Sequence, residues 1–285
     1  MSKLQVAVIG LGQLGRACAQ ALLDDAELGL AGIVQPGGLA APGNGRWQRI
    51  PVAAHVRDLE RVGAALVCVP TDAVLAVARE LLQARIPIVE CACFEGQALR
   101  KHHAALDEAA LHHRVAAVVG AGWDPGVLPL LRSAFEMLIP HGQTVVHRHP
   151  GLHLHHSAAV AGVRGVKDAL AGEYRGGNGA SQHYVYVELE RGIELGPVQQ
   201  AIAADPLFAG EAPQVFQVPR LSELEQEDGN GVVLQRRGNG KHGPHQSLLL
   251  EARCDPLAFA ARVMLDGARK LPGLARGAHR YSLGL

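Results

Sequence analysis

Short continuous apolar runs alternate with longer amphipathic segments along the chain up to residue 120. The amphipathic segments have apolar residues at helical spacing, and the runs have the length of strands buried on both faces. The expected strands are 4–9, 28–34, 64–69, 86–91 and 115–119, and the expected helices are 16–23, 71–81 and 97–113. Strands that alternate with helices of this length pair in parallel through right-handed crossovers. The pattern predicts an α/β fold, a Rossmann-type doubly wound parallel sheet.

The rhythm of the sequence changes after residue 120. A helix is expected at 127–138, and the apolar runs that follow are longer and alternate with polar residues, as in 184–190. Such alternation is typical of an antiparallel sheet with one solvated face. The expected strands are 143–149, 182–190, 214–218, 231–237 and 245–252, followed by an amphipathic helix at 256–270. This part of the chain therefore predicts a second, α+β domain.

A glycine-rich turn joins the first strand to the first helix. Its pattern is Gly10-x-Gly12-x-x-Gly15. In a dinucleotide-binding turn, the first glycine permits the tight turn, the second lets the backbone approach a pyrophosphate, and the third brings the helix close to the strand. The N–H groups at the helix start, where Gln13 and Leu14 lie, would then face the phosphates. The alternative is a glycine-rich turn in an unrelated α/β protein.

The residue after the second strand bears on cofactor preference. A carboxylate there binds the ribose hydroxyls of NAD, and arginine accepts the 2′-phosphate of NADP. This chain has Gln35, which is neither, whereas Arg46 and Arg49 lie farther along the same loop. The sequence favours NADP(H), with NAD(H) as the alternative if both arginines are simply solvated. Ligands of such sheets bind at the carboxyl ends of the strands, so Pro70 and Thr71 are expected to contact the cofactor.

A second turn with candidate catalytic residues follows the fifth expected strand. It contains Gly122, Trp123, Asp124 and Pro125. Proline disfavours a helical conformation at the residue before it, so Asp124 stands at the start of the next helix. An acid held beside a large aromatic ring is suited to bind an amine, with the ring as a flat apolar wall. The alternative is that Asp124 only caps the helix and Trp123 only fills the core.

These motifs resemble those of the meso-diaminopimelate D-dehydrogenase family. The resemblance rests on 6–16, on the Gly122-Trp-Asp-Pro-Gly turn, on Gly151-Leu, Ser157 and 163–167, and on 277–280. It implies NADP-dependent reversible oxidation of a D-configured amine to a keto acid, with release of ammonia. It also implies a homodimer of two-domain subunits whose C-terminal helix returns to the first domain. We therefore expect a dinucleotide-binding domain at 1–121 with 255–285, and a substrate and dimerisation domain at 122–254.

The resemblance also assigns roles to residues. Asp124 would bind the reacting amino group, and Trp123 and Gly122 would line the pocket. A loop that touches substrate in the family corresponds to the region of His153, His156 and Ser157, where an imidazole would assist proton transfer.

The chain departs from the family pattern at three places. A second family aspartate at the reacting amine is replaced by Cys93. The paired arginines after the second strand are missing near Gln35. An arginine is lost near Ser181 and an asparagine is replaced in the 243–245 region, so we expect an altered pocket for the distal end of the substrate.

The composition of the chain excludes some classes of protein. The formal net charge is zero and the pI is about 7.3, which argues against a general binder of nucleic acid or anionic membranes. Five cysteines lie mostly in apolar segments, as in a reduced, cytoplasmic protein without a membrane span or leader. Histidines concentrate in 147–156, where a shared metal is one interpretation and a solvated surface or pocket wall is the other. The surface or pocket wall is the expectation, so we expect no metal.

Together these features predict an NAD(P)-dependent amino-acid dehydrogenase acting on a small-molecule amino-acid substrate. The first alternative is an imine or oxo-acid reductase with the same cofactor. The second is a protein that senses the dinucleotide without catalysis.

Overall fold

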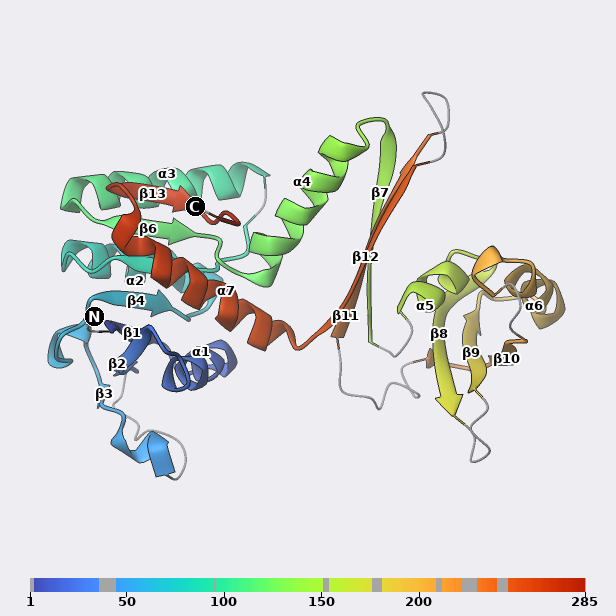
Figure 1. Cartoon of the computed structure of the whole chain (residues 1–285), viewed down its shortest axis with the longest axis horizontal. Coiled ribbons are helices and arrows are strands. Elements are labelled where there is room, and N and C mark those ends of the chain that lie inside the picture. The colour runs from blue at the N-terminus through green and yellow to red at the C-terminus, as the bar shows by residue number, and fades with distance from the viewer. Residues whose placement is uncertain are drawn as a thin grey trace. The chain divides into compact units, whose positions relative to one another are not determined.

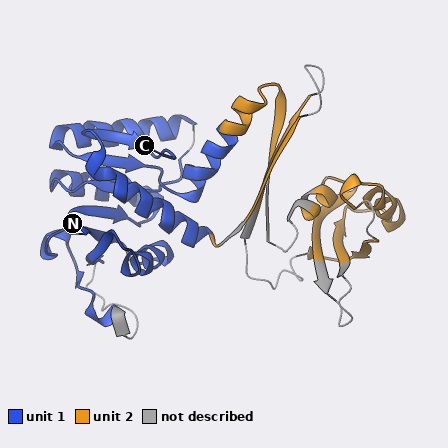
Figure 2. Ribbon diagram, viewed as in Figure 1, with its two compact units in different colours: residues 1–133, 256–285 blue, residues 134–255 orange. Residues whose placement is uncertain are grey.

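The computed structural model describes residues 3–35, 45–94, 96–150, 154–175, 181–208, 212–221, 230–239 and 246–284. The chain divides into two compact units (Figure 2). Unit 1 comprises Met1–Ser133 together with Pro256–Leu285, and unit 2 comprises Ala134–Asp255. The division lies within helix α4 (Leu128–Leu138), later than the domain boundary at 121 that the sequence suggests.

Unit 1 is built on a seven-stranded sheet in the order β13-β6-β5-β4-β1-β2-β3, and every neighbouring pair is parallel (Figure 1). Its strands are β1 (Leu4–Ile9), β2 (Leu28–Val34), β3 (Val52–Ala53), β4 (Ala64–Val67), β5 (Ile88–Glu90), β6 (Ala116–Val119) and β13 (Gly277–Arg280). The five apolar runs that were expected to be strands all contain strands here, because each can be buried on both faces. This is the doubly wound parallel sheet that the sequence predicts.

Helices cover both faces of this sheet. They are α1 (Gln13–Leu23), α2 (Thr71–Gln83), α3 (Gly96–His113) and α7 (Pro256–Lys270). Successive strand residues point to opposite faces, so each strand contributes to two separate cores. Val6 and Val8 pack with residues of α1 and α7, whereas Ala7 and Ile9 pack with residues of α2 and α3. The carboxyl ends of the strands are thereby held in place by a core on each side.

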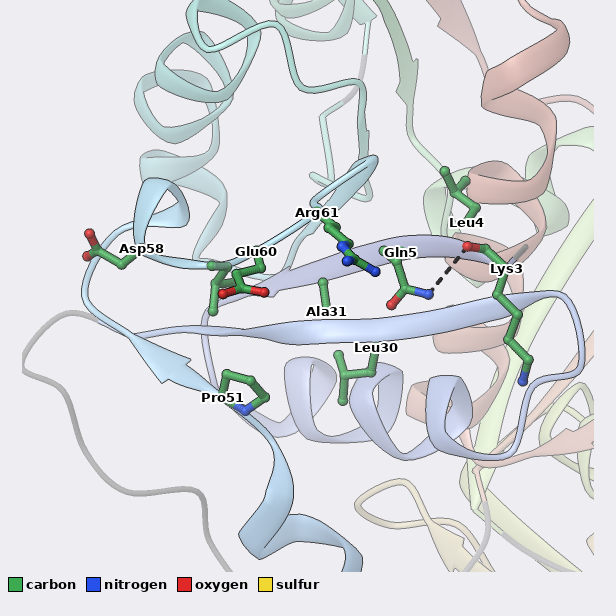
Figure 3. A pocket seen from close by; sticks show the side chains of 10 residues that line it. Lys3, Leu4, Gln5, Leu30, Ala31, Pro51, Asp58, Glu60 and Arg61 are labelled. Atoms are coloured by element: carbon green, nitrogen blue, oxygen red, sulfur yellow. Dashed lines mark hydrogen bonds between the residues drawn. The ribbon is translucent and has the colours of Figure 1, made fainter.

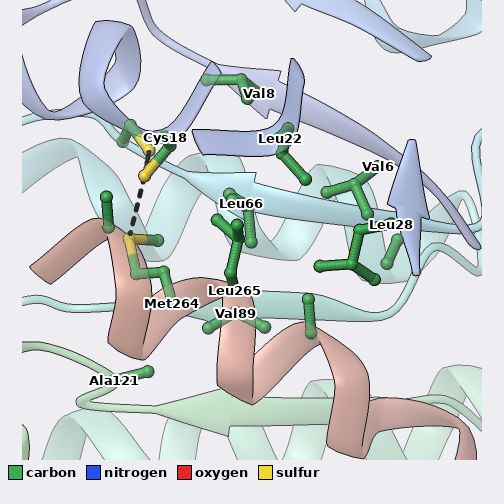
Figure 4. Packing of buried hydrophobic residues seen from close by; sticks show 14 of the residues in the cluster. Val6, Val8, Cys18, Leu22, Leu28, Leu66, Val89, Ala121, Met264 and Leu265 are labelled. Atoms are coloured by element: carbon green, nitrogen blue, oxygen red, sulfur yellow. Dashed lines mark hydrogen bonds between the residues drawn. The ribbon is translucent and has the colours of Figure 1, made fainter. Parts of the chain in front are cut away.

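Helix α7 is separated from the other helices of unit 1 by the whole of unit 2 in sequence, yet it fills the centre of one core (Figure 4). Met264 and Leu265 are buried, and the Met264 sulfur lies 3.8 Å from the Cys18 sulfur on α1. Burying a side chain of this size contributes about 1.5–3 kcal/mol. After α7, β13 adds the strand at the edge beside β6.

Unit 2 contains two three-stranded sheets, in the orders β12-β11-β7 and β10-β9-β8. Their strands are β7 (Gly142–Pro150), β8 (Val166–Arg175), β9 (Ser181–Leu189), β10 (Gln214–Gln217), β11 (Asn230–Gly238) and β12 (Ser247–Cys254). The pairings of β11 with β7 and β12 are antiparallel, and so is that of β8 with β9. The expectation of antiparallel pairing fails at β10, which lies parallel to β9.

Three elements of unit 2 were not expected from the sequence pattern. They are strand β8 and the helices α5 (Leu154–Ala161) and α6 (Leu195–Ala203). Helix α5 packs on β8, and α6 contributes the buried Val198 and Ile202 to the core around Phe208. In the described part of the histidine-rich segment, the backbone is strand up to Pro150 and helix from Leu154, so the segment does not follow one strand.

Candidate functional site

The glycine turn between β1 and α1 has three glycines with three different reasons to be glycine. Gly10 has a φ of +96°, and a Cβ there would lie 2.7 Å from the Cys68 carbonyl oxygen. A Cβ on Gly15 would lie 2.0 Å from the carbonyl oxygen of Gly10. Around a Cβ on Gly12, by contrast, no atom lies within 4 Å. The outer two glycines are required by the fold, whereas Gly12 leaves open space directly beside the backbone.

Gly12 is also the N-cap of α1, and no side chain accepts a hydrogen bond from the first turn there. The helix starts at Gln13, so the N–H groups of Gln13 and Leu14 belong to that uncapped turn. Such N–H groups and the positive end of the helix dipole form a binding site for an anion. The open space and the uncapped helix start are the two features that a pyrophosphate requires at this turn.

The side chain of Gln35 closes this turn from the end of β2. Its Oε1 atom accepts a hydrogen bond of 3.0 Å from the N–H of Leu11, next to the backbone bond from Gly10 N–H to Val34 oxygen. The side-chain oxygen of Gln35 is thus hydrogen-bonded to the glycine turn. Arg49 is exposed, whereas Pro36 and the side chain of Arg46 lie outside the described residues, so the expected role of Arg46 stays a prediction.

The end of β4 leads directly into α2. Thr71 is the first helical residue and Pro70 is the N-cap. Proline has no side-chain acceptor, which leaves this helix start without a side-chain hydrogen bond. Pro70 and Thr71 are both exposed at the same edge of the sheet as the glycine turn. We call this edge, where the parallel strands end, the carboxyl edge.

The Trp-Asp-Pro turn also lies at the carboxyl edge, between β6 and α4. Residues Trp123–Val127 form a π-helical turn, η3, in which Asp124 has an extended backbone with φ −129° and ψ 105°. This conformation is the one expected for a residue before proline. Asp124 is exposed, and Trp123 is half-buried with its ring 5.2 Å from that of Phe259, edge to face. Helix α7 thus packs against the tryptophan through the ring of Phe259.

The turn after β5 lies beside the Trp-Asp-Pro turn. Cys93 is exposed there, and a Cβ on Gly122 would lie 3.3 Å from the Cβ of Cys91. Burial, aided by the neighbouring Glu90 carboxylate, raises the pKa of Cys91 to about 12, so this side chain is a neutral thiol. The structure brings the expected residues Cys93, Gly122, Trp123 and Asp124 onto two adjacent turns.

Glu90 is a feature that the sequence did not single out. It is fully buried, and its carboxylate accepts hydrogen bonds from the N–H of Ala92 at 2.5 Å and that of Gly120 at 3.1 Å. His102 of α3 lies nearby. A buried acid of this kind is detectable in sequence only as a charged residue at the end of an apolar strand.

Two expected site residues lie in unit 2, on α5. The ring of His156 contacts that of Phe208 edge to face at 5.1 Å. Ser157 is fully buried, and its hydroxyl accepts a hydrogen bond of 2.8 Å from the N–H of Ala171 on β8. This bond joins α5 to β8, so the geometry supports a packing role for Ser157. His153 lies outside the described residues.

The described residues hold no group of three or more His, Cys, Asp or Glu side chains placed to bind a metal ion. Within the same residues, every helix is too short or too polar to cross a membrane.

A separate hollow of about 1120 Å³ opens at the other end of β1 (Figure 3). It is lined by the first residues of β1, by Leu30 and Ala31 of β2, and by the charged side chains of Asp58, Glu60 and Arg61. None of the expected site residues lines it, and it lies away from the carboxyl edge. The candidate site is therefore the group of turns at the carboxyl edge.

Comparison with known proteins identifies the family. No protein-family model matches the chain. A curated meso-diaminopimelate D-dehydrogenase of Bacteroides fragilis is 31% identical over 271 residues, which are 94% of this chain and 89% of that protein.

Solved structures share the fold. The dehydrogenase of C. glutamicum in complex with DAP has a TM-score of 0.62 and 19% identity over 99% of this chain and 93% of that chain. An engineered D-amino acid dehydrogenase bound to NADP+ has a TM-score of 0.61 and 19% identity, over 98% of this chain and 93% of that chain. From the similarity to the B. fragilis protein, which extends over nearly the whole length of both chains, the chain belongs to the meso-diaminopimelate D-dehydrogenase family.

Proposed function

We propose that this protein is an NADP(H)-dependent dehydrogenase that oxidises the amine-bearing carbon of an amino acid reversibly, with release of ammonia. The observation that supports this proposal most directly is that the candidate cofactor-binding turn and the candidate amine-binding turn lie at the same edge of one sheet. The glycine turn offers an anion site, and the Trp123-Asp124 turn offers a carboxylate beside an aromatic ring. Membership of the family supports this assignment.

The glycine turn fits a dinucleotide. Open space at Gly12 admits a pyrophosphate, and the uncapped start of α1 supplies N–H donors to it. When bound, the nicotinamide ring accepts or donates the hydride. A solved structural relative bound to NADP+ supports NADP(H) as the cofactor. We further propose that NADP(H) binds better than NAD(H), because Gln35 puts no carboxylate beside the ribose to repel a 2′-phosphate.

Asp124 is the residue we propose for the reacting amine. Its carboxylate is exposed on the turn, where it can pair with an ammonium and hold the adjacent carbon in place. Trp123 is buttressed by Phe259 and presents an apolar surface to the same ligand. Placing the two reacting carbons in contact is the largest contribution that such a site makes to the rate.

The substrate we propose is a shorter or more apolar amino acid than diaminopimelate. The far end of diaminopimelate carries a second carboxylate and ammonium, and burying these without partners costs several kcal/mol, on the order of 2–6. The resemblance implies that the family arginine and asparagine that would meet them are replaced near Ser181 and in the 243–245 region. These replacements support a changed distal pocket.

The test is ammonia-dependent oxidation of NADPH with a panel of keto acids, followed by kcat/KM for meso-diaminopimelate and simple D- and L-amino acids. We expect activity that requires ammonia, and at least one simple amino acid that exceeds meso-diaminopimelate. Oxidation of NADPH without ammonia would indicate an oxo-acid reductase, and binding without turnover would indicate a sensor. If kcat/KM for meso-diaminopimelate exceeds that for every simple amino acid by about a hundredfold, or ~2.7 kcal/mol, the proposal of an altered pocket is wrong.

The homodimer stays a prediction that light scattering can test.

A further inference from the structure

The two turns that carry the candidate chemistry are joined by one buried side chain. Strands β5 and β6 pair through Ile88 with Ala117 and through Val89 with Val118, and the pairing goes no farther. Beyond this point the backbone oxygen of Glu90 accepts the N–H of Ala121 at 2.8 Å. The connection of the two strands beyond their ladder is therefore centred on Glu90.

The carboxylate of Glu90 continues this connection. One oxygen accepts the N–H of Ala92, at the start of the turn that carries Cys93. The other accepts the N–H of Gly120, which has a φ of +73° and begins the turn that leads to Trp123 and Asp124. Because a backbone N–H that is buried without an acceptor is costly, both turns are stabilised in the positions that the carboxylate allows.

The surroundings keep the carboxylate in place. Glu90 is fully buried, and the imidazole of His102, which is 6% exposed, has its Nε2 atom 3.4 Å from Glu90 Oε1. The ring of Phe94 lies 4.6 Å from the ring of His102. Residues of α3 and of the turn after β5 thus shield the acid from water. Among the described residues, the hydrogen-bond donors to this carboxylate come from the two turns.

We propose that Glu90 is a positioning residue whose buried carboxylate sets the distance between the Cys93 turn and the Trp123-Asp124 turn. Asp124 lies four residues beyond Gly120, and its own backbone is extended within the π-helical turn η3. A shift of Gly120 therefore moves the proposed amine-binding carboxylate. This inference rests on the function proposed above, and it deepens that function by assigning the residue that orients the site.

The variant Glu90→Gln tests the inference with little change in size. The amide oxygen still accepts one N–H, but the amide nitrogen faces the other N–H as a second donor. We expect kcat to fall by about tenfold to a hundredfold, since a misplacement of about 1 Å costs that much. The Kd for NADPH should stay within about twofold, because Gly12 and α1 are not touched.

The matched control is Asp107→Asn. Asp107 lies on α3, and its Oδ1 atom, like the carboxylate of Glu90, accepts a backbone N–H. The donor is Ala278 at 2.8 Å, on β13 and away from both turns. We expect this variant to lower Tm and to leave kcat unchanged. If Glu90→Gln likewise lowers only Tm, Glu90 is a structural residue and the inference is wrong. If Glu90→Gln does not fold, Glu90→Asp keeps the charge but is too short to reach both N–H groups, and the same kcat comparison applies.

A readout that does not depend on activity separates the two proposals. The chain has two tryptophans, so Trp47→Phe leaves Trp123 as the single emitter. In this background Glu90→Gln should raise acrylamide quenching of Trp123 by about twofold, as expected when a side chain loses its fixed place. Unchanged quenching would refute the positioning role even if the protein is a dehydrogenase. Changed quenching in a protein without ammonia-dependent activity would support the positioning role and refute the proposed function.

Discussion

Gly12→Val separates the requirement of the fold from the requirement of the cofactor. Because no atom lies within 4 Å of a Cβ built on Gly12, the valine side chain meets only open space in the free protein. Its backbone, with φ −68° and ψ −171°, is accessible to valine. The stability cost is the poorer N-cap, about 1 kcal/mol, against a total of about 5–15 kcal/mol for a typical protein. The variant should therefore fold.

The cost to cofactor binding is larger. The valine fills the space through which a pyrophosphate would approach the N–H groups of α1. Losing two charge-assisted hydrogen bonds at about 1.5–3 kcal/mol each removes ~3–6 kcal/mol of binding free energy. This is a loss of at least about a hundredfold in the affinity for NADPH.

The assay is the Kd for NADPH by titration calorimetry, with Tm measured by circular dichroism on the same samples. Gly15→Ala is the contrasting variant, because its Cβ would lie 2.0 Å from the Gly10 carbonyl oxygen and must disturb the turn itself. We expect Gly12→Val to lower Tm by only about 2–4 °C and to lose NADPH binding, whereas Gly15→Ala should lower Tm further and lose binding as well. A folded Gly12→Val protein that binds NADPH as tightly as the wild type would show that the glycine turn is not the pyrophosphate site.

Two further changes test other parts of unit 1. Asp124→Asn keeps the size of the side chain and removes its charge, so kcat/KM for amine substrates should fall by about tenfold or more with the Kd for NADPH unchanged, and an equal kcat/KM would return Asp124 to a purely structural role. Burial by itself raises the pKa of Asp25, but two backbone N–H donors and Arg269 lower it overall, below the unfolded value of 3.8. Its contribution to stability is therefore complete above about pH 4 and is lost as the pH falls through the lower folded pKa. The difference in unfolding free energy between wild type and Asp25→Asn should shrink in acid, and a difference that stays constant down to pH ~2 would contradict this assignment.

Strands and helices with a clear pattern of apolar residues could be predicted from the sequence. The bounds of β1 and β2 agree with the expected 4–9 and 28–34, and α7 has its expected bounds. Strand β8 was missed because Lys167, Asp168, Gly172 and Glu173 interrupt its apolar residues. Strand β13 was missed because its four residues, Gly277–Arg280, carry almost no apolar signal and owe their conformation to pairing with β6.

Some residues of the candidate site could also be predicted from the sequence, and others could not. The roles of Gly10 and Gly15 follow from a local motif, so they were accessible from the sequence. The bond from Leu11 N–H to Gln35 depends on the packing of two loops, and no local pattern encodes it. Glu90 receives one of its N–H partners from Gly120, which lies thirty positions later in the chain. Because a glutamate is usually exposed, only the fold reveals that this one is buried.

The return of the chain to unit 1 has a consequence for protein synthesis. Residues 134–255 emerge from the ribosome before α7 and β13 exist, yet the core beside α1 needs Met264 and Leu265. Domains usually fold in the order of their synthesis. Here unit 2 has all of its own strands first, while one face of the N-terminal sheet is covered only in part, by α1. The part of the chain that is translated first is thus the last to complete its fold, and a chaperone that covers apolar surface would be needed longest at β1, β4 and α1.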